Sequence, residues 1–290
     1  MTRLALLADI HGNLPALDAV LADLAQFSVD HVIVAGDVVN WGPFSAEVMA
    51  RVTDAGWAVI RGNNEYYLID HDTPRAPGQW REYTLIPWLK RQLVGRWHTA
   101  IATWPDTLSL RFPDAPAIRL YHGSPRSNTD SVYPSSLDAE VIGRLTGVEE
   151  STIILAHTHL PMDRRVNGWH VLNPGSVGVP LDGIFSASYM LMEGSATGWR
   201  ATFRRVPFDY APLFAEFERQ GFVEECGVIA HLAMEEFRTA RLRVSPFLHW
   251  RAAVCPRAPL TVDLLPEFEK ADAWAHTPFG FHVNRNGDKP

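Results

Sequence analysis

The sequence predicts an α/β fold built around a parallel β-sheet. Three short, mainly apolar runs, Leu4–Ala8, Val32–Ala35 and Gly56–Ile60, each lead into polar residues, and the segments that separate them have helical character. Strands that alternate with helices in this way are typical of a parallel sheet. Ligands of open α/β sheets bind at the carboxyl ends of the strands. The polar residues that follow the predicted strands are therefore the candidate functional residues.

The composition is that of an ordinary globular protein. The chain has 290 residues, of which 47% are hydrophobic and 20% charged, enough for one large domain or for one domain with an appendage. No apolar run approaches the length of about 18 residues that a membrane-spanning helix needs. A net charge of −7 argues against a general nucleic-acid binder, which usually has a basic face. The two cysteines form no disulfide framework, so we expect a cytoplasmic protein.

The first predicted strand, Leu4–Ala8, leads into Asp9 and His11. Its apolar start lacks the small-residue cleavage site of a signal peptide, so we interpret it as a strand. Residues i and i+2 of an extended segment point to the same side, so Asp9 and His11 can direct an oxygen and a nitrogen at one point. A helix over Leu14–Phe27 follows, with Asn13 as a suitable N-cap.

The next two strands lead to Asp37 and Asn63. Asp37 follows the second strand, and we expect its carboxylate to bridge two metal ions. A helix is expected over Phe44–Thr53. Asn63 follows the third strand and offers a neutral carbonyl oxygen that suits a divalent cation, although Gly and Asn also favour simple turns. Glu65 is expected to form hydrogen bonds near the site rather than to bind metal.

Later strands add three histidines. The strand Ala117–Tyr121 ends at His122, and the strand Thr152–Ala156 ends at His157 and His159, which again have i and i+2 spacing. The other predicted elements before residue 207 are the helices Tyr83–Trp97 and Leu137–Leu145, the strands Leu108–Phe112 and Trp169–Leu172, and a hairpin of Phe185–Met192 with Trp199–Val206.

The character of the chain changes after Pro207. The segments Asp209–Gln220 and Phe222–Val244 have helical spacing, whereas the proline-containing stretch from Pro246 onward has no clear period. We therefore predict a domain of residues 1–207 and a helical and irregular extension of residues 208–290. The extension could cap the site, form the interface of a homo-oligomer or cover an apolar face. Residues 284–290 are expected to fray.

The strand ends together supply seven candidate metal ligands: Asp9, His11, Asp37, Asn63, His122, His157 and His159. Seven protein ligands would crowd one metal ion. Two ions that share one carboxylate have about four protein ligands each and keep positions for water, as catalysis requires. Mixed imidazole and carboxylate ligands suit manganese, iron, zinc or nickel.

Five motifs carry a resemblance to a known family. They are D-x-H, G-D-x-x-N, G-N-x-E, H-G-S-P and H-T-H, in this order, and they resemble the calcineurin-like metallophosphoesterase superfamily over residues 3–206. The resemblance is closest to a small prokaryotic branch of phosphodiesterases and phosphatases. It implies a four-layer αββα sandwich of two mixed β-sheets. It also implies one metal ion held by Asp9, His11, Asp37 and His159, and another held by Asp37, Asn63, His122 and His157.

The activity that this resemblance implies is hydrolysis of a phosphodiester or phosphomonoester. A hydroxide that bridges the two metal ions would attack phosphorus in line with the leaving group. The partner would be a small phosphorylated molecule, with nucleotides among the candidates. The alternatives are a phosphatase for nucleotides or small molecules, and a non-catalytic scaffold with this fold. All seven ligand positions are retained, which argues against the scaffold.

One departure from the family pattern concerns proton transfer. Many relatives have a histidine that assists the leaving group at the position of Asn64. Asn64 can donate a hydrogen bond to substrate but cannot transfer a proton at neutral pH. We therefore hypothesise that activity favours good leaving groups or that another histidine compensates.

The second departure concerns substrate binding. The protein-phosphatase motif G-D-x-x-D-R-G has Asn40 and Trp41 here in place of Asp and Arg, which argues against a protein phosphatase. Trp41 could stack on a base or merely cover the sheet edge. Arg61 and Arg126 are candidate phosphate-binding residues, although each could equally be an exposed arginine beside a loop.

Overall fold

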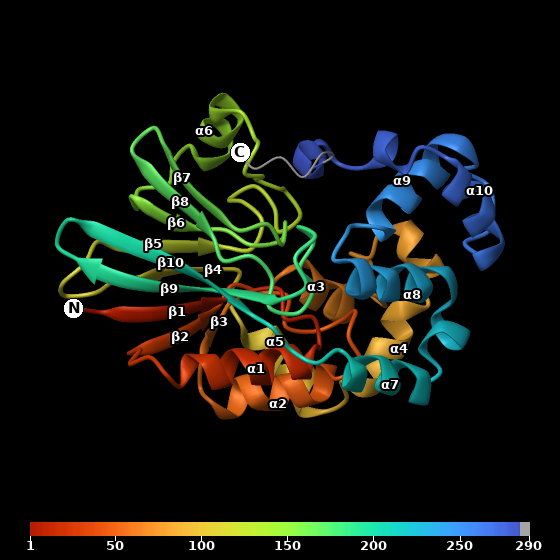
Figure 1. Ribbon diagram of the computed structural model, residues 1–290, viewed down its shortest axis with the longest axis horizontal. Helices are drawn as coiled ribbons and strands as arrows, with labels where there is room; N and C mark the ends of the chain where they lie inside the picture. The colour runs from red at the N-terminus through yellow and green to blue at the C-terminus, as the bar shows by residue number, and fades with distance from the viewer. Residues whose placement is uncertain (285–290) are drawn as a thin grey trace.

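The computed structural model describes residues 1–284, and residues 285–290 lie outside the described part. Figure 1 shows two stacked β-sheets with helices on their outer faces. The first sheet has the order β10 (Gly198–Val206), β9 (Ala187–Ser195), β1 (Arg3–Leu7), β2 (His31–Val34), β3 (Ala58–Val59). The second has the order β4 (Thr107–Leu110), β5 (Ile118–Tyr121), β6 (Thr152–Ile154), β8 (Trp169–Asn173), β7 (Met162–Val166).

Both sheets mix parallel and antiparallel pairs. In the first sheet β1, β2 and β3 are parallel, as the alternation of strands and helices predicts, and β9 and β10 form the predicted antiparallel hairpin. In the second sheet β6 is parallel to β5 and β8, whereas β4 and β7 are antiparallel edge strands. The predicted sandwich of two mixed sheets is confirmed.

The sandwich has three apolar layers. Side chains from the facing sides of the two sheets, such as Leu4, Ile33, Ile154 and Met190, form the central core. The helices α1 (Leu14–Leu24) and α2 (Ser45–Asp54) cover the outer face of the first sheet, and α6 (Asp138–Leu145) covers the second (Figure 1). The side chain of Asn13 caps α1 by accepting a hydrogen bond from the Ala16 amide at 3.1 Å, as predicted.

Three elements between residues 60 and 166 differ from the prediction. The helix expected over Tyr83–Trp97 is two helices, α4 (Leu85–Gln92) and α5 (Arg96–Thr103), because Gly95 between them has a φ of +67°. The segment that begins at Asn63 is a helix, α3 (Asn63–Asp70), rather than a simple turn. The edge strand β7 was not predicted at all.

The C-terminal region is more helical than expected. The helix predicted over Phe222–Val244 ends earlier, because Ala240 has a φ of +50°. The helices here are α7 (Ala211–Arg219), α8 (Phe222–Thr239), α9 (Val244–Val254) and α10 (Leu265–Lys270). Short 3-10 helices are η1 (Gly78–Glu82), η2 (Val262–Leu264), η3 (Ala273–His276) and η4 (Phe279–Asn284).

The C-terminal helices share a core with the preceding part of the chain. The rings of Trp88 in α4 and Phe222 in α8 lie 4.6 Å apart, and both belong to the apolar cluster that includes α1. Figure 1 shows α4 beside α8 at the end of the molecule away from the strand tips near the N-terminus. The boundary near residue 207 stays a prediction. None of the helices within residues 1–284 has the length and apolar character required to cross a bilayer.

Candidate active site

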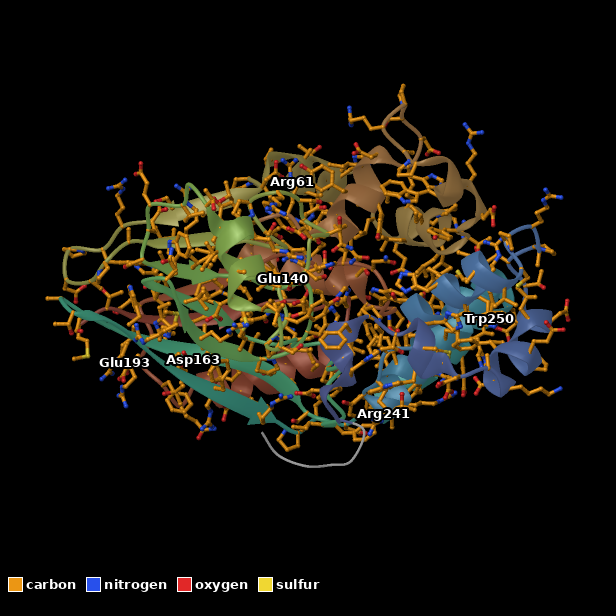
Figure 2. All side chains as sticks on the ribbon, turned by 90° about the horizontal axis from the view of Figure 1, so that it is seen from above. Arg61, Glu140, Asp163, Glu193, Arg241 and Trp250 are labelled. Atoms are coloured by element: carbon orange, nitrogen blue, oxygen red, sulfur yellow. The ribbon has the colours of Figure 1, made fainter. Side chains whose placement is uncertain are left out.

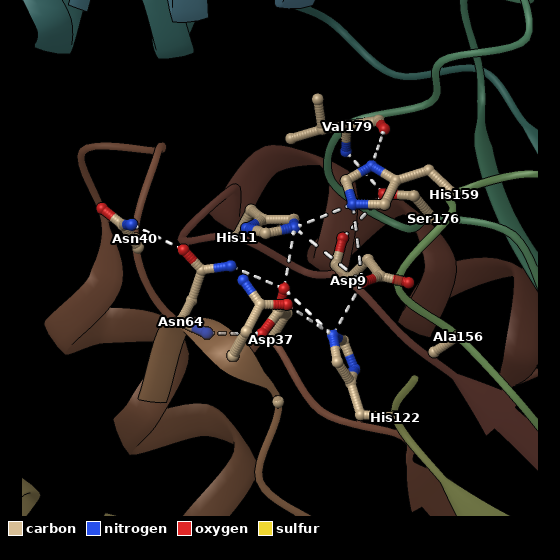
Figure 3. Close-up of polar contacts among 12 residues, drawn as sticks. Asp9, His11, Asp37, Asn40, Asn64, His122, Ala156, His159, Ser176 and Val179 are labelled. Atoms are coloured by element: carbon tan, nitrogen blue, oxygen red, sulfur yellow. Dashed lines mark hydrogen bonds and ion pairs between the residues drawn. The ribbon is translucent and has the colours of Figure 1, made fainter. Parts of the chain in front are cut away.

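The predicted metal ligands gather in two adjacent groups. Figure 3 shows Asp9, His11, Asp37, His122 and His159 pointing toward one another. Asp9 and His11 follow β1, Asp37 follows β2, His122 follows β5, and the last two histidines follow β6. Asn63 does not come directly from a strand as expected, because β3 ends at Val59 and Asn63 is the first residue of α3. Parallel strands bring these loops to one edge of each sheet, and the stacking of the two sheets brings the two edges together.

The backbone in these loops is not extended as the sequence suggested. Five candidate ligands have left-handed conformations, with φ values of +52° at Asp9, +51° at His11, +52° at Asp37, +67° at His157 and +59° at His159. Positive φ values are uncommon for residues other than glycine, cost free energy and cluster at functional sites. Neighbouring loops also bond to each other, since the His11 amide donates to the Asp37 carbonyl at 3.0 Å.

The first candidate group consists of Asp9, His11 and His159, whose ligand atoms lie within 4.8 Å of one another. The Nε2 atoms of the two histidines are 3.1 Å apart, and Nε2 of His159 is 3.5 Å from Oδ1 of Asp9. Three potential ligand atoms from two loops thus face a common point.

The second candidate group consists of Asp37, His122 and His157, again within 4.8 Å. Nε2 of His122 is 3.3 Å from Oδ2 of Asp37 and 3.1 Å from Oδ1 of Asn63. Asp37 also connects the groups, since its Oδ2 lies 3.7 Å from Nε2 of His11.

Hydrogen bonds behind the imidazoles set their orientation. His122 donates from Nδ1 to the Ala35 carbonyl at 2.8 Å, and His159 donates from Nδ1 to the Val179 carbonyl at 2.6 Å. In a neutral ring such as that of His159, a proton on Nδ1 leaves the lone pair of Nε2 directed at the centre of the site, an arrangement common in metal-binding histidines.

The environment of the Asp9 carboxylate shows whether a cation fits between the candidate ligands. The side chain of Asp9 is fully buried, and neither carboxylate oxygen has a hydrogen-bond partner among residues 1–284. Burial raises the pKa of Asp9 well above its usual value, against the opposing effect of His122. Burial of a carboxylate without a compensating partner is costly, and a divalent cation between Asp9 and the imidazoles would compensate it. The oxygen and nitrogen donors present fit such an ion.

The histidines differ in their protonation. Burial lowers the pKa of His157 to about 3 and that of His159 to about 4, so both rings are neutral at pH 7. Burial also acts to lower the pKa of His122, but the charges of Asp37 and Asp9, together with hydrogen bonds to Asp37 and the Ala35 carbonyl, raise this pKa to about 10. The site therefore contains neutral imidazole ligands beside a tightly coupled pair of His122 and Asp37.

Glu65 ties α3 to the loop that carries Asp37. Its buried carboxylate accepts hydrogen bonds from the amides of Gly62 at 2.6 Å, Asp37 at 3.0 Å and Val38 at 2.8 Å. Burial and the nearby charge of Asp37 raise the pKa of Glu65 to about 7. Glu65 thus has the hydrogen-bonding environment that the sequence analysis expected.

The candidate substrate-binding residues Trp41, Arg61 and Arg126 form contacts of their own. Trp41 packs edge-on near His11, with ring centroids 6.5 Å apart. Arg61 donates from Nε to Asp106 at 2.8 Å and lies at one face of the molecule in Figure 2. Arg126 donates to the Gly143 carbonyl at 2.7 Å. The hydrogen bonds and ion pairs of the two guanidinium groups within residues 1–284 go to other residues than the candidate metal ligands, and both phosphate-binding roles stay predictions.

Asn64 lies against Asp37. Its side-chain amide donates to Oδ2 of Asp37 at 2.6 Å, and its backbone amide donates to Oδ1 at 2.9 Å. The sequence analysis assigned no role to Asn40, whose side-chain amide donates to Asn64 at 2.6 Å. The spacing of Asn40 from Asp37 is the only sequence feature that could have indicated this contact.

Comparison with known proteins adds three findings. The model of the calcineurin-like phosphoesterase superfamily domain matches residues 2–196. The uncharacterized protein MJ0912 of Methanocaldococcus jannaschii is 22% identical over 243 residues, which cover 78% of this chain and 96% of that protein. The phosphodiesterase YfcE of Escherichia coli is 27% identical over 206 residues, which cover 67% and 88% of the two chains.

A solved structure supports the fold independently. The metallophosphoesterase from Sphaerobacter thermophilus aligns with a TM-score of 0.65 at 24% sequence identity. The alignment covers 82% of this chain and 100% of that chain. The likeness extends beyond the residues matched by the family model and shows that the two chains share their overall architecture.

Proposed function

Because the chain belongs to the calcineurin-like phosphoesterase superfamily and is a metal-dependent phosphoesterase, we propose that it hydrolyses a phosphodiester at a site for two divalent metal ions. The preference for a diester over a monoester is supported by the similarity to YfcE, which is described as a phosphodiesterase. The substrate is a small phosphorylated molecule, and nucleotides are among the candidates.

The observation that carries this proposal is the pair of adjacent ligand groups. Asp9, His11 and His159 form one group, and Asp37, His122 and His157 form the other. Asn63, whose Oδ1 lies 3.1 Å from Nε2 of His122, would add a carbonyl oxygen to the second group, and Asp37 would serve both ions. The buried carboxylate of Asp9, which accepts no hydrogen bond from the part of the chain that the structure describes, supports a positive charge at the first position.

When bound, two divalent ions would supply a water acidic enough to attack phosphorus in line with the leaving group, and positive charge against the phosphate oxygens. The side chains hold and orient the reacting groups. His122 and His159 keep their rings fixed through their Nδ1 hydrogen bonds. Asn64 is a hydrogen-bond donor and moves no proton.

The test is to measure hydrolysis of bis-p-nitrophenyl phosphate and p-nitrophenyl phosphate side by side with added Mn²⁺. We expect faster turnover of the diester and its loss in the variant Asp37→Asn, which retains the shape of the side chain and removes its charge. Faster monoester turnover would instead identify a phosphatase. If neither compound reacted and the protein bound no metal, the scaffold alternative would replace the proposal.

A further inference from the structure

Two asparagine amides form a hydrogen-bonded chain that ends on Asp37 (Figure 3). Nδ2 of Asn40 donates to Oδ1 of Asn64 at 2.6 Å. Nδ2 of Asn64 donates to Oδ2 of Asp37, also at 2.6 Å. Asn40 and Asn64 are each 2% exposed, so neither amide exchanges its partner readily with water.

The chemistry of the partners fixes the orientation of both amides. An ionised Asp37 can only accept hydrogen bonds, so Asn64 must direct its nitrogen toward this carboxylate. The side-chain oxygen of Asn64 then faces Asn40, so Asn40 must donate a hydrogen bond to it from Nδ2. The opposite orientation of Asn64 would place its oxygen against the carboxylate, where two acceptors repel each other.

The backbone holds Asn40 in the place that this chain requires. Its φ is +75°, a left-handed conformation that asparagine tolerates better than most residues. Its amide donates to Oγ of Ser45 at 3.1 Å, and its carbonyl accepts from the Gly42 amide at 2.8 Å. Oδ1 of Asn40 is buried and has no hydrogen-bond partner among residues 1–284. The bond from Nδ2 to Asn64 is therefore the only hydrogen bond that the side chain of Asn40 forms within these residues.

We propose that Asn40 is a positioning residue that keeps the side-chain amide of Asn64 turned toward Asp37 and thereby fixes Oδ2 of that carboxylate. The inference rests on the proposed role of Asp37 as a metal ligand. Groups that orient metal ligands typically contribute about 10- to 100-fold to metal affinity or activity, so Asn40 affects the site without touching metal or substrate.

Two variants separate the loss of the donor from a change of charge. Asn40→Asp keeps the shape and tolerates positive φ but cannot donate at neutral pH, and it adds a negative charge. Asn40→Gly also tolerates positive φ and removes the donor without adding charge. If loss of the donor is the cause, both variants change the site in the same direction despite their different charges.

The experiment is a titration of the full chain with Mn²⁺, followed by turnover of bis-p-nitrophenyl phosphate, for wild type, both Asn40 variants, Asn64→Ala and the double variant Asn40→Gly/Asn64→Ala. Thermal melting checks that each variant is folded. We expect Asn40→Asp and Asn40→Gly to weaken Mn²⁺ binding roughly tenfold. The double variant should bind Mn²⁺ like Asn64→Ala alone, because Asn40 acts through Asn64.

Mn²⁺ affinity at the wild-type level in either folded Asn40 variant would overturn the inference. So would full additivity of Asn40→Gly and Asn64→Ala. These outcomes are distinct from failure of the proposed function, since Mn²⁺ binding is measured without turnover. A wild type that binds Mn²⁺ but hydrolyses neither ester would refute the activity and still report whether Asn40 positions Asn64.

Discussion

Gly62 leaves just enough room for the carboxylate of Asp37. A Cβ atom at this position would lie 2.1 Å from Oδ1 of Asp37 and 2.6 Å from its backbone nitrogen. Heavy atoms cannot approach so closely, and the loop cannot retreat because Glu65 bonds to amides on both sides of the contact. Glycine is thus required here by the close approach of two loops, not by an unusual φ.

We therefore predict that Gly62→Ala displaces Asp37 and weakens Mn²⁺ binding by roughly 100-fold, because the orientation of a ligand controls its affinity. Gly78→Ala is the matched control, since a Cβ at Gly78 would meet nothing within 4 Å. Calorimetric titration of both variants with Mn²⁺ checks this. Equal affinities for the two variants would mean that Asp37 is not held against Gly62 in solution.

Single residues were predictable where chemistry alone identifies them. The carboxylates and imidazoles that follow apolar strands could be found in the sequence because metal ligands need those side chains. The left-handed backbone of Asp9 and His157 could not be predicted, because aspartate and histidine do not indicate a positive φ as glycine does. The ion pair of Arg61 with Asp106 was also hidden, since the two residues are far apart in the sequence.

A buried glutamate of helix α8 caps the start of helix α9. Oε1 of Glu236, in α8, accepts hydrogen bonds from the amides of Arg243 at 2.8 Å and Val244 at 2.9 Å. Glu236 is 3% exposed, and burial raises its pKa from 4.5 to about 7 despite these hydrogen bonds. The short connection between α8 and α9 is thus held by a carboxyl group whose raised pKa favours its neutral form.

The raised pKa makes the free energy of unfolding depend on pH. Between pH 4.5 and 7 the folded protein retains a proton on Glu236 that the unfolded chain has released, so the contribution of Glu236 is complete below pH 4.5 and is lost as the pH rises toward 7. The loss is on the order of 3 kcal/mol. Glu236→Gln cannot ionise and still offers an oxygen to both amides.

We expect Glu236→Gln to be more stable relative to wild type at pH 8 than at pH 5. Urea unfolding of both proteins at the two pH values measures this difference, and comparison with wild type removes the contribution of other titrating groups. A difference between the two proteins that is the same at pH 5 and pH 8 would show that Glu236 has an ordinary pKa.

Elements were predictable where the apolar period was long and uninterrupted. The helix after Asn13 and the β9–β10 hairpin were found for this reason. Helix α3 was missed because Gly62, Asn63 and Asn64 favour turns, and contacts with Asp37 and Glu65 override that local preference. The break at Gly95 was missed because the apolar spacing continues across it.

The whole molecule depends on the C-terminal helices for part of its core. Phe217 and Phe222 are at most 1% exposed, and Phe222 packs on Trp88 of α4. Burial of each such side chain contributes about 1.5–3 kcal/mol, against a total stability of about 5–15 kcal/mol for a typical domain. The C-terminal helices therefore bury apolar side chains in the same cluster as α4 and α1, and the boundary near residue 207 stays a prediction.

Truncation after residue 207 should accordingly prevent cooperative folding, because it exposes α4 and the apolar side of α1. Thermal unfolding followed by circular dichroism tests this, with the full chain as the reference. A truncated protein that melts cooperatively near the temperature of the full chain would support two independent domains and would exclude a structural role for residues 208–290.

At this level the sequence could indicate the α/β class and its parallel strands, but not the order of strands in the sandwich. That order depends on which strands meet across long connections, such as β1 between β2 and β9. The C-terminal helices past Pro246 were obscured because they are short and interrupted by prolines. The convergence of all seven candidate ligands needs the two sheets to stack, which no local pattern specifies.

The most direct test of the two-metal site is the number of metal ions bound per chain. The full-length protein would be stripped with a chelator, dialysed to equilibrium against saturating Mn²⁺ and analysed for bound metal and protein concentration. The arrangement of Asp9, Asp37 and their histidines predicts two Mn²⁺ ions per chain. One ion or none at saturation would contradict the two-metal site on which the proposed function depends.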